Sequence, residues 1–221
     1  MKKRIFTSYL NPMRVFTIVA CCFFLFVHRL HAQLNGMLVY DVELVTNDTL
    51  NPQNKWQVVV YTNDTMVRVE TQGGPFGKQV YIRHMVLNKA YLLLAMEGQK
   101  FAIRTDLSKN NNDSTKNYTT KKVFGSKKIQ GIKCNKYLIT DNGAPAGYYC
   151  YFAKKIPNKY LEVYSEIQGL ALDYFLPSQN GLIHYQLAQY QPQILEKNMF
   201  GIPSDYKKVT FEEFMNSLNK D

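Results

Sequence analysis

The sequence predicts a mainly β fold, an antiparallel sheet followed by a single C-terminal α-helix. Short segments rich in Val, Ile, Leu and Tyr recur about every 8–12 residues and are separated by turn residues, which is typical of antiparallel all-β domains. Only one segment, close to the C-terminus, shows the periodicity of an amphipathic helix. The remaining chain, residues 33–221, is long enough for one domain with its own core.

Residues 1–32 predict a secretory signal peptide. Residues 15–27 (VFTIVACCFFLFV) form an uncharged apolar run that follows basic residues, and Ala32 supplies a small residue at the cleavage point. The run is shorter than the roughly 20 apolar residues that span a bilayer. We therefore expect cleavage between Ala32 and Gln33 and a soluble product in the periplasm or outside the cell.

Two alternatives concern this leader. Met13 directly precedes Arg14 and the apolar run, so translation from either Met1 or Met13 would preserve the signal. Residues 18–21 (IVAC) resemble a bacterial lipobox, which would attach lipid to Cys21. The apolar run continues for six residues beyond Cys21, and for that reason we favour the cleaved, non-lipidated product.

Positive charge is concentrated in one stretch of the chain. Removing residues 1–32, which contain five Lys or Arg and no acid, lowers the formal net charge from +10 to +5. Residues 108–136 then hold eight lysines and a single acid, Asp113. Export and the lack of arginine argue against nucleic-acid binding. We expect a solvated basic face, and the alternative is attraction to anionic lipid headgroups or an acidic partner.

Strand-like segments follow one another along the mature chain. In residues 66–70, for example, Val67 and Val69 alternate with polar or flexible neighbours. The predicted strands are 36–45, 56–61, 66–70, 79–87, 90–96, 100–104, one from Val123, 131–140, 148–153, 170–176 and 182–190. The polar, Asn-rich residues 108–120 predict a long mobile loop. Pro192 lacks a backbone N–H, which predicts that the final strand is an edge strand.

Residues 210–219 predict the C-terminal helix. Thr210 and Glu213 have the spacing of a capping box, in which each side chain binds the backbone N–H of the other residue. One apolar stripe at helical spacing should pack on the sheet, and it consists of Phe211, Phe214, Met215 and Leu218.

Two cysteines remain after removal of the leader, Cys134 and Cys150, and they flank the turn segment 141–147. If the flanking segments form a hairpin centred on this turn, the two side chains lie opposite each other on one face. A cross-strand disulfide is then expected in an oxidising compartment. The alternative is two buried free thiols that pack as small apolar groups.

Five stretches together resemble the DUF4412 family, exported proteins of unknown function that are common in Bacteroidetes, and more distantly the GLPGLI-type exported proteins. The matching stretches are residues 68–70 (RVE), the strands through 91–94 (YLLL) and 100–101 (KF), 129–137 (IQGIKCNKY), 167–172 (IQGLAL) and 202–214 (IPSDYKKVTFEEF). The resemblance implies a curved sheet or half-open barrel like the lipoprotein carriers LolA and LolB. The resemblance implies no catalytic residues for this chain. An N-terminal helix such as those carriers have is not evident here.

Three Asp-Thr or Asp-Ser pairs resemble the acceptor motif for O-glycosylation of exported Bacteroidetes proteins. The acceptor hydroxyls would be those of Thr49, Thr65 and Ser114, all in predicted turns or loops. The alternative is that these are ordinary turn residues.

The sequence contains no recognisable catalytic, phosphate-binding or metal-binding motif. Cys134 with His84 or His184 would be a nucleophile and base, and Glu70 with Asp41 would be a carboxylate pair, but neither combination has a supporting pattern. We expect a monomeric, non-catalytic protein without cofactor or metal. Its function would be to bind an apolar or lipid-like ligand or a lipoprotein, and the alternative is an envelope interaction module without a small ligand.

Overall fold

The computed structural model describes residues 34–45, 55–73, 77–96, 98–105, 118–141 and 147–218. These residues belong to one compact unit. The predicted leader, with Met1, Met13, Cys21 and the Ala32–Gln33 junction, lies outside the described residues. In the described part of the chain, no helix has the length and hydropathy to cross a membrane.

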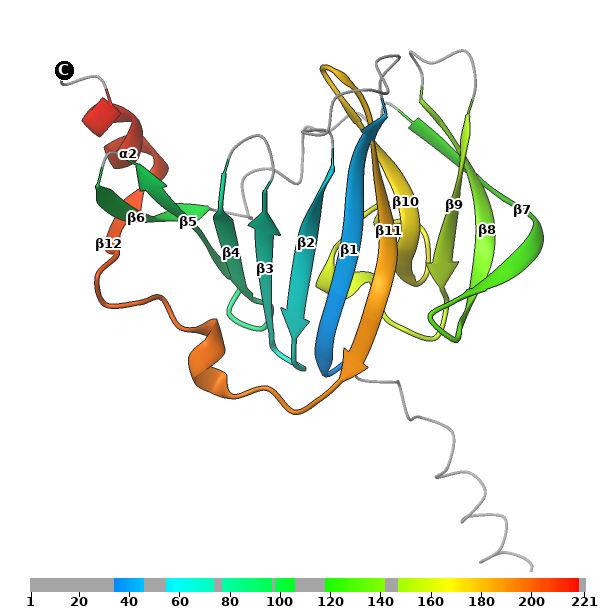
Figure 1. Ribbon diagram of the computed structural model, residues 1–221, viewed down its shortest axis with the longest axis horizontal. Coiled ribbons are helices and arrows are strands. Elements are labelled where there is room, and N and C mark those ends of the chain that lie inside the picture. The colour runs from blue at the N-terminus through cyan, green and yellow to red at the C-terminus, as the bar shows by residue number, and fades with distance from the viewer. Residues whose placement is uncertain are drawn as a thin grey trace, which may run out of the picture. The chain divides into compact units, whose positions relative to one another are not determined.

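One open twelve-stranded sheet, with a helix at its C-terminal end, makes up the described fold (Figure 1). The mainly β prediction is therefore confirmed. The chain first builds a meander of six antiparallel strands: β1 (Gly36–Val45), β2 (Lys55–Thr62), β3 (Met66–Gln72), β4 (Gln79–His84), β5 (Lys89–Met96) and β6 (Gln99–Thr105).

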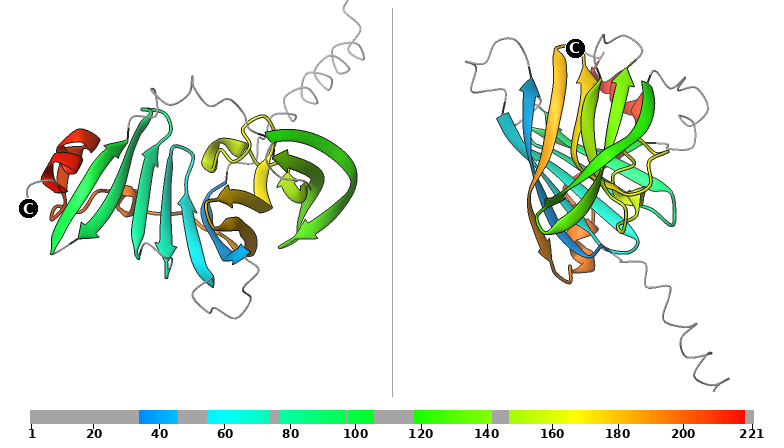
Figure 2. Two further views of the ribbon diagram at one scale, coloured as in Figure 1. Left: turned by 90° about the horizontal axis from the view of Figure 1, so that it is seen from above. Right: turned by 90° about the vertical axis from the view of Figure 1, so that its right-hand side faces the viewer.

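A second meander starts at the opposite end of the sheet and returns to the first. It contains β7 (Tyr118–Ile129), β8 (Ile132–Asp141), β9 (Tyr148–Ala153), β10 (Leu170–Ser178) and β11 (Gly181–Pro192). Because β11 pairs with β1, these two strands form the centre of the sheet. We call strands β2–β6 the first wing and strands β7–β10 the second wing, which curls strongly in Figure 2.

The last part of the chain returns along the first wing. Residues 193–206, which include the 3-10 turn η3 (Lys197–Phe200), run from β11 to β12 (Lys207–Thr210) (Figure 1). Strand β12 joins the edge of β6 in parallel, so the otherwise antiparallel sheet ends with one parallel pair. Helix α2 (Phe211–Leu218) follows directly.

Pro192 does not mark an edge strand, and that prediction is wrong. β11 pairs with β1 over Leu182–Pro192 but with β10 only over Gly181–Gln186. Pro192 therefore lies beyond the part of β11 that needs ladder hydrogen bonds on both sides, and its missing N–H is tolerated there. The strands at the ends of the sheet are β7 and β12.

The predicted loop 108–120 ends earlier than expected, because β7 already begins at Tyr118. Residues 106–117 lie outside the described residues. Tyr118 is held in the sheet by pairing with Asp141 and by an edge-to-face contact with Tyr164, at 4.9 Å between ring centroids. The local sequence is polar and rich in asparagine, and it predicts neither of these two contacts.

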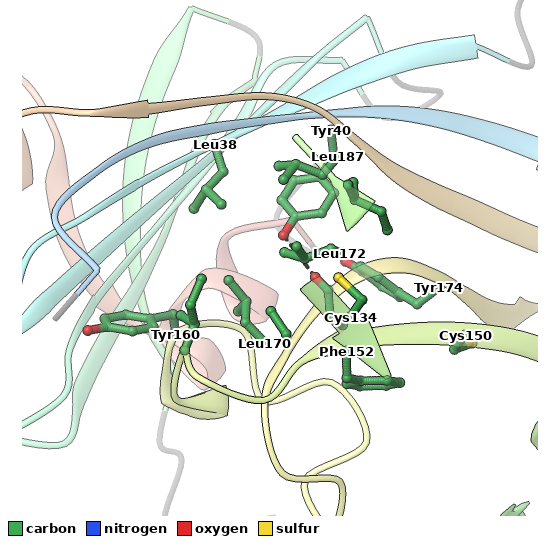
Figure 3. Packing of buried hydrophobic residues seen from close by; sticks show 14 of the residues in the cluster. Leu38, Tyr40, Cys134, Cys150, Phe152, Tyr160, Leu170, Leu172, Tyr174 and Leu187 are labelled. Atoms are coloured by element: carbon green, nitrogen blue, oxygen red, sulfur yellow. Dashed lines mark hydrogen bonds between the residues drawn. The ribbon is translucent and has the colours of Figure 1, made fainter. Parts of the chain in front are cut away.

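The main hydrophobic core lies on one face of the sheet, which we call the front face. Register places Leu38, Tyr40 and Val42 of β1 on this face, and each is at most 2% exposed. The Tyr40 hydroxyl donates to the Ala171 carbonyl at 2.9 Å, so this buried phenol is satisfied (Figure 3).

Residues 154–169, which connect β9 to β10, cover the front face of the second wing. Tyr164 packs edge-to-face on Phe152, and its hydroxyl donates to the Phe175 carbonyl at 2.5 Å. Tyr160 accepts a hydrogen bond from the Leu34 N–H at 3.0 Å. This face is therefore filled by the protein's own side chains.

Helix α2 covers the front face at the other end of the sheet. Thr210 donates its N–H to Glu213 at 2.7 Å and accepts from the Glu213 N–H at 3.1 Å, which is the predicted capping box. Phe214 packs on Phe101 of β6, with ring centroids 5.4 Å apart, and is 7% exposed. The helix and the docking of Phe214 were thus predicted correctly. The other three residues of the predicted stripe do not pack on the sheet, since Phe211 is 62% exposed, Met215 41% and Leu218 46%.

Candidate functional site

An apolar groove lies on the opposite, back face of the first wing, beneath residues 193–206. Its volume is about 230 Å³. Most of its lining is apolar, and the residues that form it are Met66, Ile82, His84, Leu87, Lys89, Tyr91, Phe200, Ile202 and Lys208. We call this site the apolar groove.

The floor of the apolar groove comes from the alternation of side chains along β3, β4 and β5. Met66 pairs with His84, and Ile82 pairs with Tyr91, so these side chains share the back face. Ile82 is 3% exposed and belongs to a small second core cluster, on which Met66, Tyr91 and Ile202 pack as partly buried neighbours. The floor is therefore continuous with a packed core.

An arginine fixes the wall that faces this floor. Arg68 donates through Nη1 to the Met199 carbonyl at 3.1 Å and through Nε to Glu70 Oε1 at 2.6 Å. Both side chains are less than 20% exposed, so this ion pair is largely buried. It connects β3 to η3 and holds Phe200, which is 3% exposed, against the groove.

The rim of the apolar groove combines exposed apolar and basic side chains. In the turn between β4 and β5, Val86 is 72% exposed and Leu87 is 58% exposed. The Leu87 N–H donates to His84 Nδ1 at 3.2 Å. The exposed side chains Lys89 and Lys208 complete the rim.

A polar cleft of about 440 Å³ lies elsewhere on the back face, where β2, β1 and β11 meet. Several of its polar side chains are paired with each other across neighbouring strands. Gln57 Nε2 donates to Asp41 Oδ1 at 3.0 Å, and Lys55 Nζ lies 3.4 Å from Glu43 Oε1. Because these polar side chains already bind one another across the strands, fewer of them are free to bind a ligand in the polar cleft.

His184, on the border of this cleft, is held by the buried carboxylate of Asp173. His184 Nε2 lies 2.8 Å from Asp173 Oδ1, and Lys127 Nζ lies 2.6 Å from Asp173 Oδ2. Phe175 stacks on the imidazole at 4.2 Å between centroids. Burial acts to raise the pKa of Asp173, but the hydrogen bonds from His184 and Lys127 outweigh it, and its pKa is lowered.

The residue combinations considered for catalysis are not assembled. Cys134 is completely buried, and burial raises its pKa to about 11, so it is a thiol rather than a nucleophilic thiolate at neutral pH. Glu70 is paired with Arg68, whereas Asp41 is paired with Gln57 on another strand. Among the described residues, no group of three or more His, Cys, Asp or Glu side chains is suited to hold a metal ion.

Cys134 and Cys150 are both buried free thiols in the structure. The turn-centred register that would place them opposite each other is wrong: Cys150 pairs with Tyr137, and Cys134 pairs with Lys127 of β7. The hairpin is shifted by three residues from the symmetric pairing, so the geometric basis for a cross-strand disulfide is missing. Figure 3 shows the two side chains apart.

Of the three predicted glycosylation sites, only Thr65 lies among the described residues, and Thr49 and Ser114 lie outside them. Thr65 is exposed in the turn between β2 and β3. Asn63 Oδ1 accepts from the N–H groups of Thr65 at 3.0 Å and Met66 at 2.8 Å, which is an Asx turn. The turn explains the residue types, and modification of Thr65 stays a prediction.

Strand β7 forms a basic edge of the second wing. Between the pairs Lys122–Tyr137 and Ser126–Asn135 the strand bulges, and Phe124 within the bulge is fully exposed. The exposed lysines here are Lys121, Lys122 and Lys128 of β7 and Lys133 of the neighbouring strand β8. A bulge and lysines on an edge strand oppose pairing with a further strand.

No protein-family model and no curated protein matches the chain. Solved structures of similar fold include PNGF-II, with a TM-score of 0.51 and 13% identity over 83% of this chain and 33% of that chain. MucB in complex with MucA(peri) has a TM-score of 0.41 and 13% identity over 79% of this chain and 56% of that chain. The Pseudomonas aeruginosa MucA/MucB complex has a TM-score of 0.44 and 14% identity over 79% of this chain and 57% of that chain.

This chain thus spans about a third of PNGF-II and little more than half of the MucB-complex chains that it matches. At 13% identity the similarity to PNGF-II concerns the fold alone. The resemblance to the DUF4412 family stays a prediction.

The apolar groove itself was not predicted from the sequence. Its residues come from β3, β4, β5, η3, β12 and the connecting segments, and they lie as far apart as Met66 and Lys208. No short motif joins them. Only the unusual pair of apolar residues in a turn, Val86 and Leu87, is a local signal of this site.

Proposed function

We propose that this chain is an exported, non-catalytic binding module whose apolar groove holds an apolar part of its ligand. The observation that carries the proposal is the apolar lining of the groove, which stays partly exposed between the first wing and residues 193–206. Ligand sites are concave, mostly apolar and lined by a few polar groups. The front face of the second wing, in contrast, is filled by Tyr40, Phe152 and Tyr164.

The size of the apolar groove favours a narrow ligand. Sites for compact small molecules have volumes of roughly 300–1,000 Å³. The volume of about 230 Å³ here is below that range, which favours a ligand that inserts only one apolar chain. A lipid or the acyl chain of a lipoprotein has this shape, and the leader predicted in residues 1–32 would bring the protein to the cell envelope, where such chains occur.

A series of straight-chain alcohols tests the groove without involving charge. Titrating hexanol, octanol and decanol into a chain that begins at Gln33 should shift the methyl NMR signals of Ile82 and Ile202. The affinity should rise about fourfold for each added methylene, since burial of one methylene stabilises by about 0.8 kcal/mol. Equal affinity along the series, or shifts confined to other methyl groups, would contradict the proposal.

Two isoleucines on the same returning segment provide matched variants. Ile202 lines the groove, whereas Ile194 is 98% exposed and does not. Ile202→Gln should weaken decanol binding at least tenfold, and Ile194→Gln should leave it unchanged. The same loss in both variants would show that the alcohol binds nonspecifically.

An interaction module that uses the basic edge of β7 is the second candidate function. The fully exposed Phe124, between exposed lysines, favours it. The partner would be acidic, and Phe124→Ser or a rise in salt concentration should abolish its binding while the alcohols still bind to the groove. Unchanged binding in the Phe124→Ser protein would exclude this edge as the contact.

A further inference from the structure

The rim of the apolar groove carries nitrogen donors, and from it we infer the class of ligand: an anionic amphiphile. Its apolar chain lies in the groove, and its carboxylate or phosphate is bound by His84, Lys89 and Lys208. The inference rests on the proposed function above and adds the headgroup that the same site recognises.

Three of the nine residues that line the groove carry side-chain N–H donors of basic type, and none is acidic. His84 and Lys89 pair directly across β4 and β5 and so share the back face, while Lys208 comes from β12. The donors therefore come from three different strands around one hollow. Such an excess of positive charge at an apolar site is complementary to a ligand with one apolar and one anionic end.

Neither rim lysine is engaged in an ion pair within the part of the chain that the structure describes. Other lysines are paired: Lys100 with Asp205 and Lys127 with Asp173, each at 2.6 Å. Lys89 and Lys208 are exposed, so their ammonium groups are free to approach a bound headgroup. Ammonium groups bind both carboxylates and phosphates.

The backbone fixes which ring nitrogen of His84 is available. Its Nδ1 accepts the Leu87 N–H at 3.2 Å and therefore carries no proton in this arrangement. The proton of the neutral ring is then on Nε2, which is left to donate to a ligand. The β4–β5 turn thus prepares His84 as a hydrogen-bond donor even when the ring is uncharged.

A single chain length with different headgroups tests the inference. Decanoate, decyl phosphate, decanol and decyltrimethylammonium, each below its micelle concentration, would be titrated into the chain that begins at Gln33. We expect the two anions to bind about tenfold more tightly than decanol, as charge-assisted hydrogen bonds predict. The cation should bind more weakly than decanol. Comparing the affinities of decanoate and decyl phosphate shows whether the site prefers a fatty-acid carboxylate or a phospholipid-like phosphate.

Rim variants separate the headgroup from the chain. Lys89→Gln and Lys208→Gln should each lower decanoate affinity about threefold and leave decanol affinity unchanged. His84→Asn, whose amide oxygen can accept from Leu87 in place of Nδ1, should likewise weaken decanoate alone. Lys128→Gln on the β7 edge is the matched control and should change neither ligand.

The outcomes distinguish this inference from the proposed function. If decanol and decanoate bind equally well and the rim variants have no effect, the groove binds apolar chains but the headgroup inference is wrong. If no member of the set binds, the proposed function itself fails. If decanoate binds but the Lys128→Gln control weakens it as much as the rim variants do, the charge effect is nonspecific and the inference is wrong.

Discussion

Asp173 is a buried carboxylate next to an apolar stretch of the sequence. It follows the apolar residues 170–172, yet it is a carboxylate only 5% exposed that binds His184 through one oxygen and Lys127 through the other. These two partners come from β11 and β7, on either side of β10 in the order of the sheet. Sequence reasoning missed the cluster because the three residues meet only through sheet pairing.

Replacing Asp173 by Asn should destabilise the protein by about 2 kcal/mol at neutral pH, because two charge-assisted hydrogen bonds are lost in a partly buried site. The folded-state pKa of Asp173 is lowered, so its contribution is present above the unfolded pKa of about 3.9 and is lost as pH falls through the folded value. Urea unfolding at several pH values measures this, with Asp205→Asn, at an exposed ion pair, as the control. A difference that persists at the lowest pH would contradict the account.

The two cysteines should behave as unreactive thiols in the native protein. Burial raises the pKa of Cys134 to about 11 and that of Cys150 to about 12, which removes the reactive thiolate at neutral pH. A thiol reagent added to the chain that begins at Gln33 should label neither residue until urea unfolds it, and then both. A native mass lower by two hydrogen atoms would instead reveal a disulfide.

At the scale of elements, local signals predicted what local interactions determine. The capping box of Thr210 and Glu213 acts within four residues, and helix α2 begins where it was expected. In the β8–β9 hairpin, by contrast, Cys150 pairs with Tyr137 rather than with Cys134. A turn-rich connection allows several registers, so the sequence midpoint between two cysteines was a poor guide.

Helix α2 should depend on one aromatic contact. Phe214→Ala removes the edge-to-face packing on Phe101 and should cost about 3 kcal/mol, measured by urea unfolding. Phe211→Ala, at an exposed position one turn earlier, should cost less than about 0.5 kcal/mol. Equal losses of stability in the two variants would mean that the helix does not dock through Phe214.

At the scale of the whole molecule, the two wings share one core. The main cluster contains Val60 and Val67 from the first wing and Ile139 and Phe152 from the second. The central β1–β11 pair joins the first strand of the sheet to the eleventh, and Gly36 lies opposite Pro192. The strand segments were predictable from their apolar alternation, but this order of strands depends on pairs of residues that are 137 to 156 positions apart.

A shared core predicts that the two wings unfold together. Ile139 of β8 is completely buried, and Ile139→Ala should cost about 2–5 kcal/mol. Trp56, the single tryptophan, lies on β2 in the first wing and packs against the same cluster. The urea midpoint from Trp56 fluorescence should therefore fall by the same amount as that from far-ultraviolet circular dichroism. If the fluorescence midpoint stays where it is in the unmodified protein, the wings unfold independently and the cluster does not couple them.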